Sequence, residues 1–215
     1  NNVANKTYNI AETLNLSSSG GSTTTVTVTG SVLFKWIEDS ILSGSLATQA
    51  ADQFGSSVAT NAAGDVLIVG AALDEAGATT SAGLAYIFVS GAGGWTQQSI
   101  LSGSLATGSY DYFGHSVGMN STGDRVVVGA YQDERSSQAT GQNEGLAYIF
   151  VSGAAGWTQQ SILSGSLAIQ ANDYFGYSVG MNSTGDRVVV GAYQDEVNNR
   201  SEEHTSELQS RFGIS

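Results

Sequence analysis

The sequence contains no cysteine and no proline, and few of its residues are charged. The lack of cysteine excludes a disulfide-stapled scaffold and a structural thiolate metal site. Charged residues make up only 12% of the chain and hydrophobic residues 40%, which excludes a highly charged disordered protein. No run of about 18 apolar residues occurs, so no membrane-spanning helix is expected in this sequence.

Basic residues are especially scarce. Only 7 Lys and Arg stand against 19 Asp and Glu, which gives a formal net charge of −12. Nucleic acid is therefore not expected as a partner, because its phosphates would be repelled.

The strongest pattern that is present is an internal repeat of about 60 residues. The string ILSGSLA begins at residues 41, 100 and 162, and a Phe-Gly pair follows at residues 54, 113 and 175. The segments 113–134 and 175–196 are identical except for His115, which Tyr177 replaces. Glycine, at 28 residues, is expected mainly in the turns that separate the strands of each unit.

Each unit contains four strand-like runs and no apolar pattern of helical period. In the second unit these runs are 113–117, 125–129, 145–151 and 157–163, rich in β-branched and aromatic residues. The Asn-Ser-Thr-Gly-Asp string at 120–124 predicts a tight turn between the first two. The sequence therefore predicts an all-β fold, an incomplete β-propeller of about three four-stranded antiparallel blades.

The repeat boundaries predict the domain organisation. Residues 1–40 are interpreted as a partial or capping blade with a Ser/Gly/Thr-rich loop. The remaining predicted units are blades at 41–99 and 100–161, a truncated blade at 162–199, and a separate tail at 200–215.

The two ends of the sequence carry their own predictions. It starts without Met or a signal segment and is interpreted as a mature chain or an internal fragment. Residues 200–210, RSEEHTSELQS, resemble the translation of a sequencing adapter, and an index-like stretch follows. We therefore predict that residues 200–215 are an artefact without function; a natural acidic tail is the alternative.

The repeated residues resemble the FG-GAP repeat family, in its short-loop branch. The resemblance rests on DYFGYSV at 173–179, VVVGA at 188–192, GLAYIF at 145–150 and WTQQ at 157–160. The integrin α-subunit head contains better-known members of this family. The resemblance implies an extracellular or cell-surface β-propeller that binds partners.

Two departures from the family pattern are visible. The calcium-binding version of the family places oxygen ligands at positions that here are Gly118, Asn120, Thr122 and Val126. Only Asn120 could ligate well, so we expect neither an integrin-type calcium site nor another cofactor. The proline of the family's name motif is replaced by Ala72, Tyr131 and Tyr193.

Acidic pairs follow the second strand of each unit and are the main candidate binding residues. They could form a rim for a cation or a basic partner, or be solvated loop charges, which we favour. The pairs are Asp74–Glu75, Asp133–Glu134 and Asp195–Glu196. Another set of aspartates precedes the Phe-Gly pair and is expected to cap turns through backbone N–H groups: Asp52, Asp111 and Asp173.

No catalytic constellation is evident in the sequence. His115 is the one histidine outside the tail, and Ser56 and Tyr177 replace it in the other units. Because no catalytic triad can then recur in the repeat, we expect that the protein is not an enzyme. Trp95 and Trp157 are expected to pack within blades. Sequons allow glycosylation in a secretory protein or simply reflect turn chemistry, and they begin at Asn5, Asn15, Asn120 and Asn182.

These observations favour a non-catalytic interaction or adhesion module of a secreted or cell-surface protein. It would bind a protein or glycan through propeller loops such as residues 130–144. A glycan-cleaving propeller enzyme and a structural repeat without ligand are the alternatives. Because blades at the ends of an open array expose strand edges, we expect contacts with neighbouring blades of a longer chain, or self-association.

Overall fold

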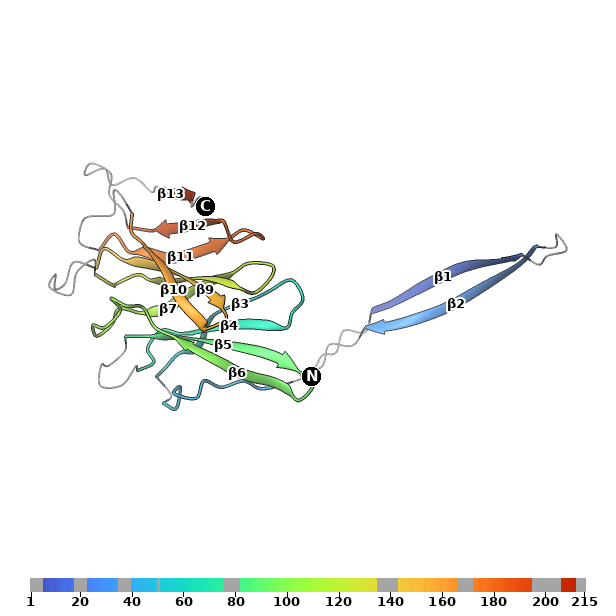
Figure 1. Cartoon of the computed structure of the whole chain (residues 1–215), viewed down its shortest axis with the longest axis horizontal. Coiled ribbons are helices and arrows are strands. Elements are labelled where there is room, and N and C mark those ends of the chain that lie inside the picture. Colours follow the sequence, from blue (N-terminus) through green and yellow to red (C-terminus); the bar gives the residue numbers. More distant parts are fainter. Residues whose placement is uncertain are drawn as a thin grey trace. The chain divides into compact units, whose positions relative to one another are not determined.

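The structure is a computed structural model of the chain, and it divides into two units, Asn1–Ile41 and Leu42–Ser215 (Figure 1). It describes the backbone of three strands at 6–17, 23–34 and 206–211, and all atoms of the residues in the following ranges: 40–49, 51–75, 82–134, 143–165 and 172–194. Within these ranges every regular element is a β-strand, which confirms the predicted all-β class. No helix long and apolar enough to cross a membrane occurs in the described part of the chain.

The first unit is a long β-hairpin. Strand β1, Lys6–Ser17, pairs antiparallel with β2, Thr23–Phe34, in an unbroken register. Thr and Val alternate at 23–29, a pattern typical of a strand, and these residues lie at the start of β2. The hairpin contains two strands instead of four, and its interpretation as part of a further blade stays a prediction.

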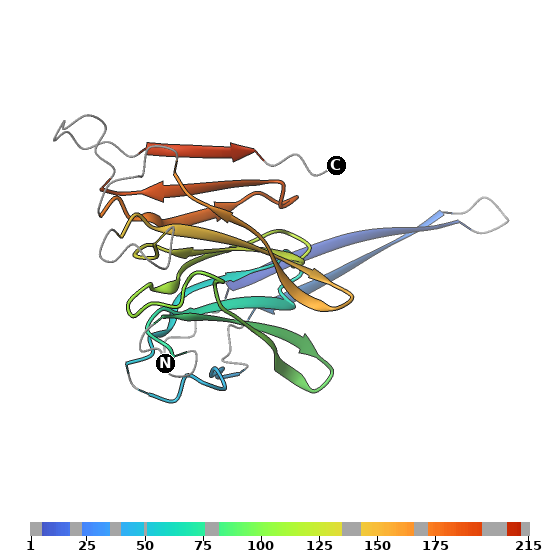
Figure 2. The same ribbon diagram turned by 60° about the vertical axis from the view of Figure 1, so that its left-hand side comes forward.

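The second unit contains the predicted blades as successive antiparallel sheets, which follow one another in chain order (Figure 2). Blade 1 comprises β3 (Phe54–Thr60), β4 (Val66–Ala71), β5 (Leu84–Gly91) and β6 (Gly94–Leu101). Blade 2 comprises β7 (Phe113–Met119), β8 (Arg125–Ala130), β9 (Leu146–Gly153) and β10 (Gly156–Leu163). Blade 3 comprises β11 (Phe175–Met181), β12 (Arg187–Ala192) and β13 (Ser206–Arg211).

The third strand of blade 3 comes from the adapter-like tail. Strand β13 pairs with β12 from Arg187↔Arg211 to Ala192↔Ser206, the same register in which β9 pairs with β8. The tail therefore takes the backbone position that the LAYIFVSG strand occupies in blades 1 and 2. Its origin as an adapter stays a prediction from the sequence.

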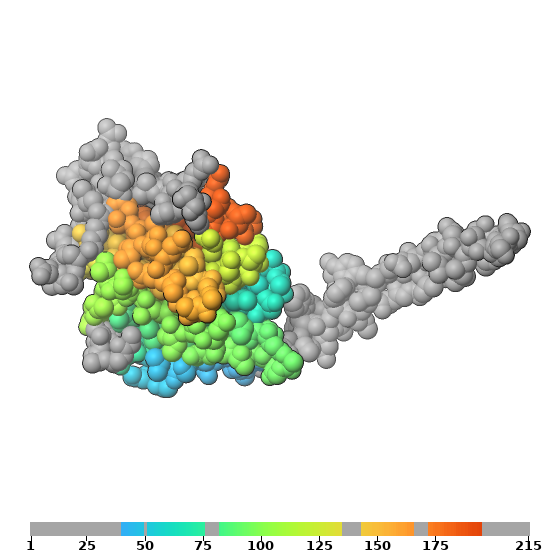
Figure 3. All heavy atoms as spheres, in the orientation of Figure 1, coloured from blue at the N-terminus to red at the C-terminus, as the bar shows by residue number. Residues whose placement is uncertain are grey.

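The blades stack through alternate faces of their strands. On β8, Val126 and Val128 pack with Ile68 of blade 1, whereas Val127 points the other way and packs with Val188 of blade 3. This follows from the two-residue period of a strand, and each fully buried valine contributes roughly 1.5–3 kcal/mol. The space-filling view shows the blades against one another in chain order (Figure 3). Trp95 and Trp157 pack on these cores, as predicted.

Glycines allow the inner strands of adjacent blades to approach closely. A Cβ atom on Gly70 would overlap the carbonyl oxygen of Gly114, and one on Gly129 would overlap that of Gly176. The prediction that the glycine excess serves turns was therefore incomplete. Glycine at these strand positions is required because two backbones meet where any side chain would clash.

Candidate binding surface

The Asn-Ser-Thr-Gly-Asp turns use their asparagine side chains internally. The Oδ1 atom of Asn120 accepts hydrogen bonds from the backbone N–H groups of Gly123, Asp124 and Arg125, at 3.1–3.2 Å. Its Nδ2 donates to the Asp124 carboxylate at 2.6 Å, and the side chain is only 2% exposed. These bonds account for the sequon by turn chemistry, and glycosylation at Asn120, whose Nδ2 atom is engaged within the turn, stays a prediction.

The other sequons differ in what the structure describes. The Nδ2 atom of Asn182 donates to Asp186 at 2.6 Å and to Thr184 at 2.8 Å, the same turn pattern in a more exposed place. Asn15 lies in β1, where only the backbone is described, and Asn5 lies outside the described residues. Glycosylation at Asn5 and Asn15 stays a prediction.

Two residues of the acidic pairs are buried, although we expected solvated charges. Asp74 and Asp133 are each 1% exposed, and each accepts a hydrogen bond from a tyrosine hydroxyl of the neighbouring strand, Tyr86 and Tyr148 respectively. The interpretation as solvated loop charge is therefore wrong for these two residues, since an ionisable side chain is buried only with a partner. Their neighbours Glu75 and Glu134 are partly exposed. Asp195 and Glu196 lie outside the described residues.

Burial raises the pKa of these carboxyl groups above the ordinary value of an aspartate. Burial raises the pKa of Asp133 to about 7, with a further rise from the negative charge of Asp111, whereas the Tyr148 hydrogen bond opposes it. Burial likewise raises the pKa of Asp111 to about 6 and also raises that of Asp74. The Asp–Tyr pairs are thus part of the blade core and not a binding rim.

Two of the aspartates before Phe-Gly cap turns, as predicted. The Asp52 carboxylate accepts from the Gln49 N–H, and the Asp111 carboxylate accepts from the Gly108 N–H, both at 2.6 Å. Asp173 is buried at the corresponding place in blade 3. The two bonds close short turns between the ILSGSLA string and the Phe-Gly pair.

A cluster of aromatic side chains that was not predicted from the sequence lies at one end of blades 2 and 3. It occupies three repeat positions: before Phe-Gly, after Phe-Gly, and after the second strand. Blade 2 places Tyr112, His115 and Tyr131 there, blade 3 places Tyr174, Tyr177 and Tyr193, and blade 1 has Gln53, Ser56 and Ala72. Together with Tyr110, the six aromatic residues of blades 2 and 3 are called the tyrosine surface below.

The rings of the tyrosine surface contact one another across the two blades. Tyr131 is central: its ring centroid lies 4.9 Å from that of Tyr112, 4.6 Å from His115, 5.3 Å from Tyr177 and 5.5 Å from Tyr174. Burial, followed by the neighbouring tyrosines, raises the pKa of Tyr131 to about 12. Such offset and edge-on contacts stabilise aromatic pairs and hold the rings in place.

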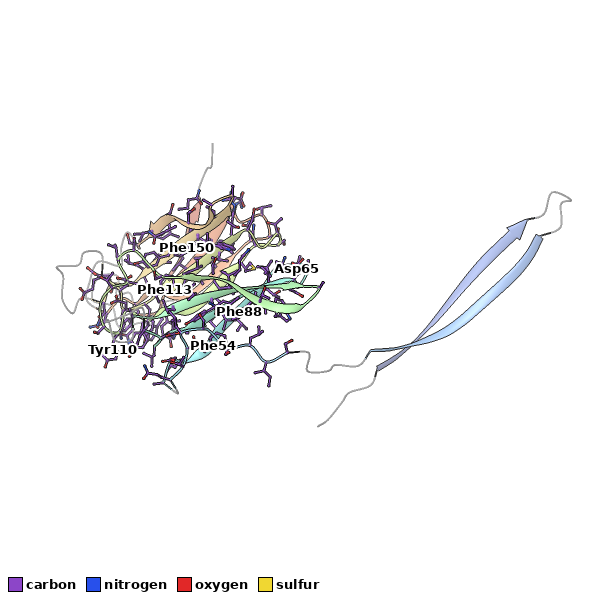
Figure 4. All side chains as sticks on the ribbon, turned by 60° about the horizontal axis from the view of Figure 1, so that its bottom comes forward. Phe54, Asp65, Phe88, Tyr110, Phe113 and Phe150 are labelled. Atoms are coloured by element: carbon purple, nitrogen blue, oxygen red, sulfur yellow. The ribbon has the colours of Figure 1, made fainter. Side chains whose placement is uncertain are left out.

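The outer rings remain open to solvent. Tyr193 is 55% exposed and Tyr177 40%, with their centroids 4.5 Å apart, and Tyr193 also stacks on Tyr174 at 5.6 Å. Tyr110 is 54% exposed and lies at the opposite end of the blades from Asp65 (Figure 4). The surface thus combines a packed centre with accessible edges.

The backbone that carries these rings is set by the repeat. Tyr112 and Tyr174 have positive φ angles of 56°, and Gln53 has 55° at the same position of blade 1. A register shift follows Phe113 on β7 and Phe175 on β11. Because blade 1 has the same conformation without aromatic residues, the strain belongs to the fold, and only the side chains distinguish the surface.

His115 is an uncharged member of this surface. Its Nδ1 atom lies 3.2 Å from the backbone oxygen of Tyr177, and burial lowers its pKa. Its ring packs against Tyr131 and Tyr177. These contacts account for His115 as a packing residue.

The surroundings of the tyrosine surface are acidic. Glu134 and Asp111 are close enough for their charges to interact. The backbone oxygen of Glu144 accepts a hydrogen bond from the Phe175 N–H, and its side-chain Oε2 atom is buried without a hydrogen-bond partner. Among the described residues, no other buried side-chain oxygen or nitrogen lacks a partner. Arg125 and Arg187, the two arginines whose side chains are described, begin β8 and β12 and so lie at the other end of their strands.

No metal centre is apparent in the described ranges, where no group of three or more His, Asp or Glu side chains could hold an ion. The expectation that the chain needs no cofactor stays a prediction. The predicted partner-facing loop is described only at its two ends, because residues 135–142 lie outside the described residues.

The chain is similar to known proteins in its repeat family and in its structure. The model of the FG-GAP repeat matches three segments, residues 46–88, 95–150 and 157–203. A search of the curated proteins found no match. Among solved structures, the chain is similar to the GH74 enzyme of Niastella koreensis, with 20% identity and a TM-score of 0.36. That match covers 70% of this chain and 22% of the enzyme.

Proposed function

Because the chain belongs to the FG-GAP repeat family, we propose that it is a non-catalytic interaction or adhesion module of a secreted or cell-surface protein. In this proposal it binds a protein partner through the tyrosine surface. The observation that carries the proposal is the concentration of exposed, mutually packed aromatic rings at one end of blades 2 and 3.

Tyrosine is well suited to protein recognition. Its ring supplies a large contact area at low conformational entropy, and its hydroxyl can form hydrogen bonds at the edge of an interface. The Tyr131 contacts hold the rings before a partner arrives, which lowers the entropy that binding must overcome. An enzyme would instead require convergent acid, base or nucleophilic groups.

The charge of the surface favours a partner with basic side chains. Arginine can stack on tyrosine rings and pair with carboxylates such as Glu134 at the same time. The formal net charge of −12 would also steer a basic partner towards the chain. We therefore propose a protein segment rich in arginine or lysine as the ligand.

Selection from a random peptide library, in parallel with an array of neutral oligosaccharides, tests this proposal. The wild-type chain should enrich peptides rich in arginine and lysine. The double variant Tyr177→Ala/Tyr193→Ala should bind those peptides at least tenfold more weakly, because two exposed rings are removed. The matched control Ile100→Ala removes a partly exposed apolar side chain from β6 and should leave the affinity unchanged.

Three outcomes would contradict the proposal. Enrichment of oligosaccharides alone would identify a glycan module, and equal peptide binding by the double variant would remove the tyrosine surface from the function. Turnover of a glycoside or ester panel that is lost on substituting Glu134 would identify an enzyme.

A further inference from the structure

The contact between blades occurs twice in this chain, in the same form. The N–H of Phe113 donates to the Ala82 carbonyl at 2.9 Å, and the N–H of Phe175 donates to the Glu144 carbonyl at the same distance. At the other end of the sheets, Ala62 N–H donates to Ser121 and Ser121 N–H donates to Ser183, at 3.0 and 2.9 Å. Each blade thus presents one face to the blade before it and a different face to the blade after it.

Two valines of the first and last blades are far more exposed than their counterparts between blades. Val117 packs towards blade 1 and is 7% exposed, whereas Val58, at the same repeat position in blade 1, is 66% exposed. Val127 packs towards blade 3 and is 0% exposed, whereas Val189, at the same position in blade 3, is 39% exposed. The open face of blade 1 and the open face of blade 3 are therefore the two halves of the interface that is already formed within the chain.

The glycine contacts repeat this arrangement. Gly129 faces the backbone of Gly176 in the next blade, and Gly191 is its counterpart in blade 3. The three atoms nearest to a Cβ on Gly191 all belong to Ser178 of its own blade, and a Cβ on Gly55, the counterpart of Gly176 in blade 1, would meet nothing within 4 Å. Neither of the two glycines that would face each other in a further contact of this kind has the backbone of another blade among its nearest contacts.

We propose that copies of this chain associate head to tail, with the Val189 face of blade 3 in one copy stacked on the Val58 face of blade 1 in the next. Gly191 then lies against Gly55, and the Ser183 N–H donates to the Ala62 carbonyl of the second copy. The occupant is a second copy because its surface is complementary by repetition, including the glycine contact that an unrelated surface would not supply. Such a heterologous contact generates rings or filaments instead of symmetric dimers.

Analytical ultracentrifugation of the full chain and of two charged variants tests the polarity of this contact. Wild-type protein should form species larger than a dimer as its concentration rises. Val58→Asp and Val189→Asp each remove one half of the contact and should be monomeric alone, because a charge would be buried without a partner. When mixed, the two variants should form a heterodimer, since one copy retains an intact Val58 face and the other an intact Val189 face.

The control is Ile162→Asp, which changes an apolar residue of β10 that is 37% exposed, close to the 39% of Val189, and should associate like the wild type. Circular dichroism verifies that each variant keeps its β structure, which is expected because Val58 and Val189 are exposed. A wild-type monomer at all concentrations, self-association of either single variant, or failure of the mixture to form dimers would overturn the proposal. The experiment contains no peptide, so its result does not depend on the binding role of the tyrosine surface.

Discussion

The buried Asp–Tyr pair is the residue-level feature that distinguishes these blades most clearly from an ordinary apolar core. In blade 2, Asp133 accepts the hydroxyl hydrogen bond of Tyr148, and the Tyr148 ring lies so close to Gly103 of the ILSGSLA segment that a Cβ there would be 2.6 Å from its Cζ atom. Blade 1 repeats the arrangement with Tyr86 and Gly44. The pair therefore attaches the connecting segment to the blade, and the repeated ILSGSLA string provides the glycine that the ring requires.

Removal of the tyrosine hydroxyl should destabilise the protein. Tyr148→Phe leaves the Asp133 carboxyl buried without its donor, which should cost about 1–3 kcal/mol in the free energy of unfolding. Chemical denaturation followed by circular dichroism measures the loss. Tyr193→Phe removes a hydroxyl from an exposed ring and should change stability by less than about 0.5 kcal/mol. Equal effects of the two variants would show that the buried hydrogen bond contributes nothing specific.

The same carboxyl groups predict a pH dependence of stability. In the folded protein the pKa of Asp133 is about 7 and that of Asp111 about 6, whereas the ordinary value is 3.8. Because the folded state binds the protons more tightly, their contribution is complete below about pH 4 and is lost as the pH rises through 6 and 7. The melting temperature should therefore fall between pH 5 and pH 8.

Asp133→Asn provides the control for this pH dependence. The amide cannot ionise, so the fall in melting temperature between pH 5 and pH 8 should become shallower in this variant. A wild-type melting temperature that rises over this interval would contradict the assignment of the shift to burial.

At the level of strands, glycine sets how closely the blades approach. The first strand of one blade passes the second strand of the preceding blade with Gly176 over Gly129. A β-branched residue there would have suited the strand itself but would have separated the blades. Local strand propensity is thus reduced at one position so that two backbones can meet.

Gly129→Ala should be strongly destabilising, because its methyl group would overlap the Gly176 carbonyl oxygen. Overpacking of this kind costs typically 1–3 kcal/mol or more. Gly153→Ala is the matched control, since a Cβ on Gly153 meets no atom within 4 Å. Thermal unfolding of the two variants compares them directly, and a similar melting temperature for both would refute the close approach.

For the molecule as a whole, the position of a blade decides the energetic role of its residues. The strand VVVGA is identical at 126–130 and 188–192, yet its middle valine is buried in blade 2 and exposed in blade 3. One sequence therefore forms a core in the centre of the stack and an open surface at its end.

Paired substitutions measure this difference. Val127→Ala should cost about 2 kcal/mol, because it leaves a cavity between blades 2 and 3. Val189→Ala, the same change at the same repeat position, should cost well under 1 kcal/mol when measured at a concentration where the chain is monomeric. Equal losses in denaturant titrations would mean that the Val189 face is already covered in the monomer.

The sequence by itself determined the repeat, the strand positions and the all-β class. Strand-like runs such as 125–129 and turn strings such as 120–124 reflect local backbone preferences, which are visible in the sequence without any tertiary contact. It also determined that Asp52 and Asp111 cap turns, because that bond spans only a few residues.

Only the tertiary structure decided which acidic residues are buried and which aromatic residues meet. From the sequence, Asp133 was predicted to be a solvated loop residue, because the Tyr148 hydroxyl that donates to it lies on another strand. Tyr131 and Tyr177 are separated along the chain and come together because adjacent blades stack in register. Contacts between repeats depend on the relative placement of whole sheets, and no local pattern in the chain encodes that placement.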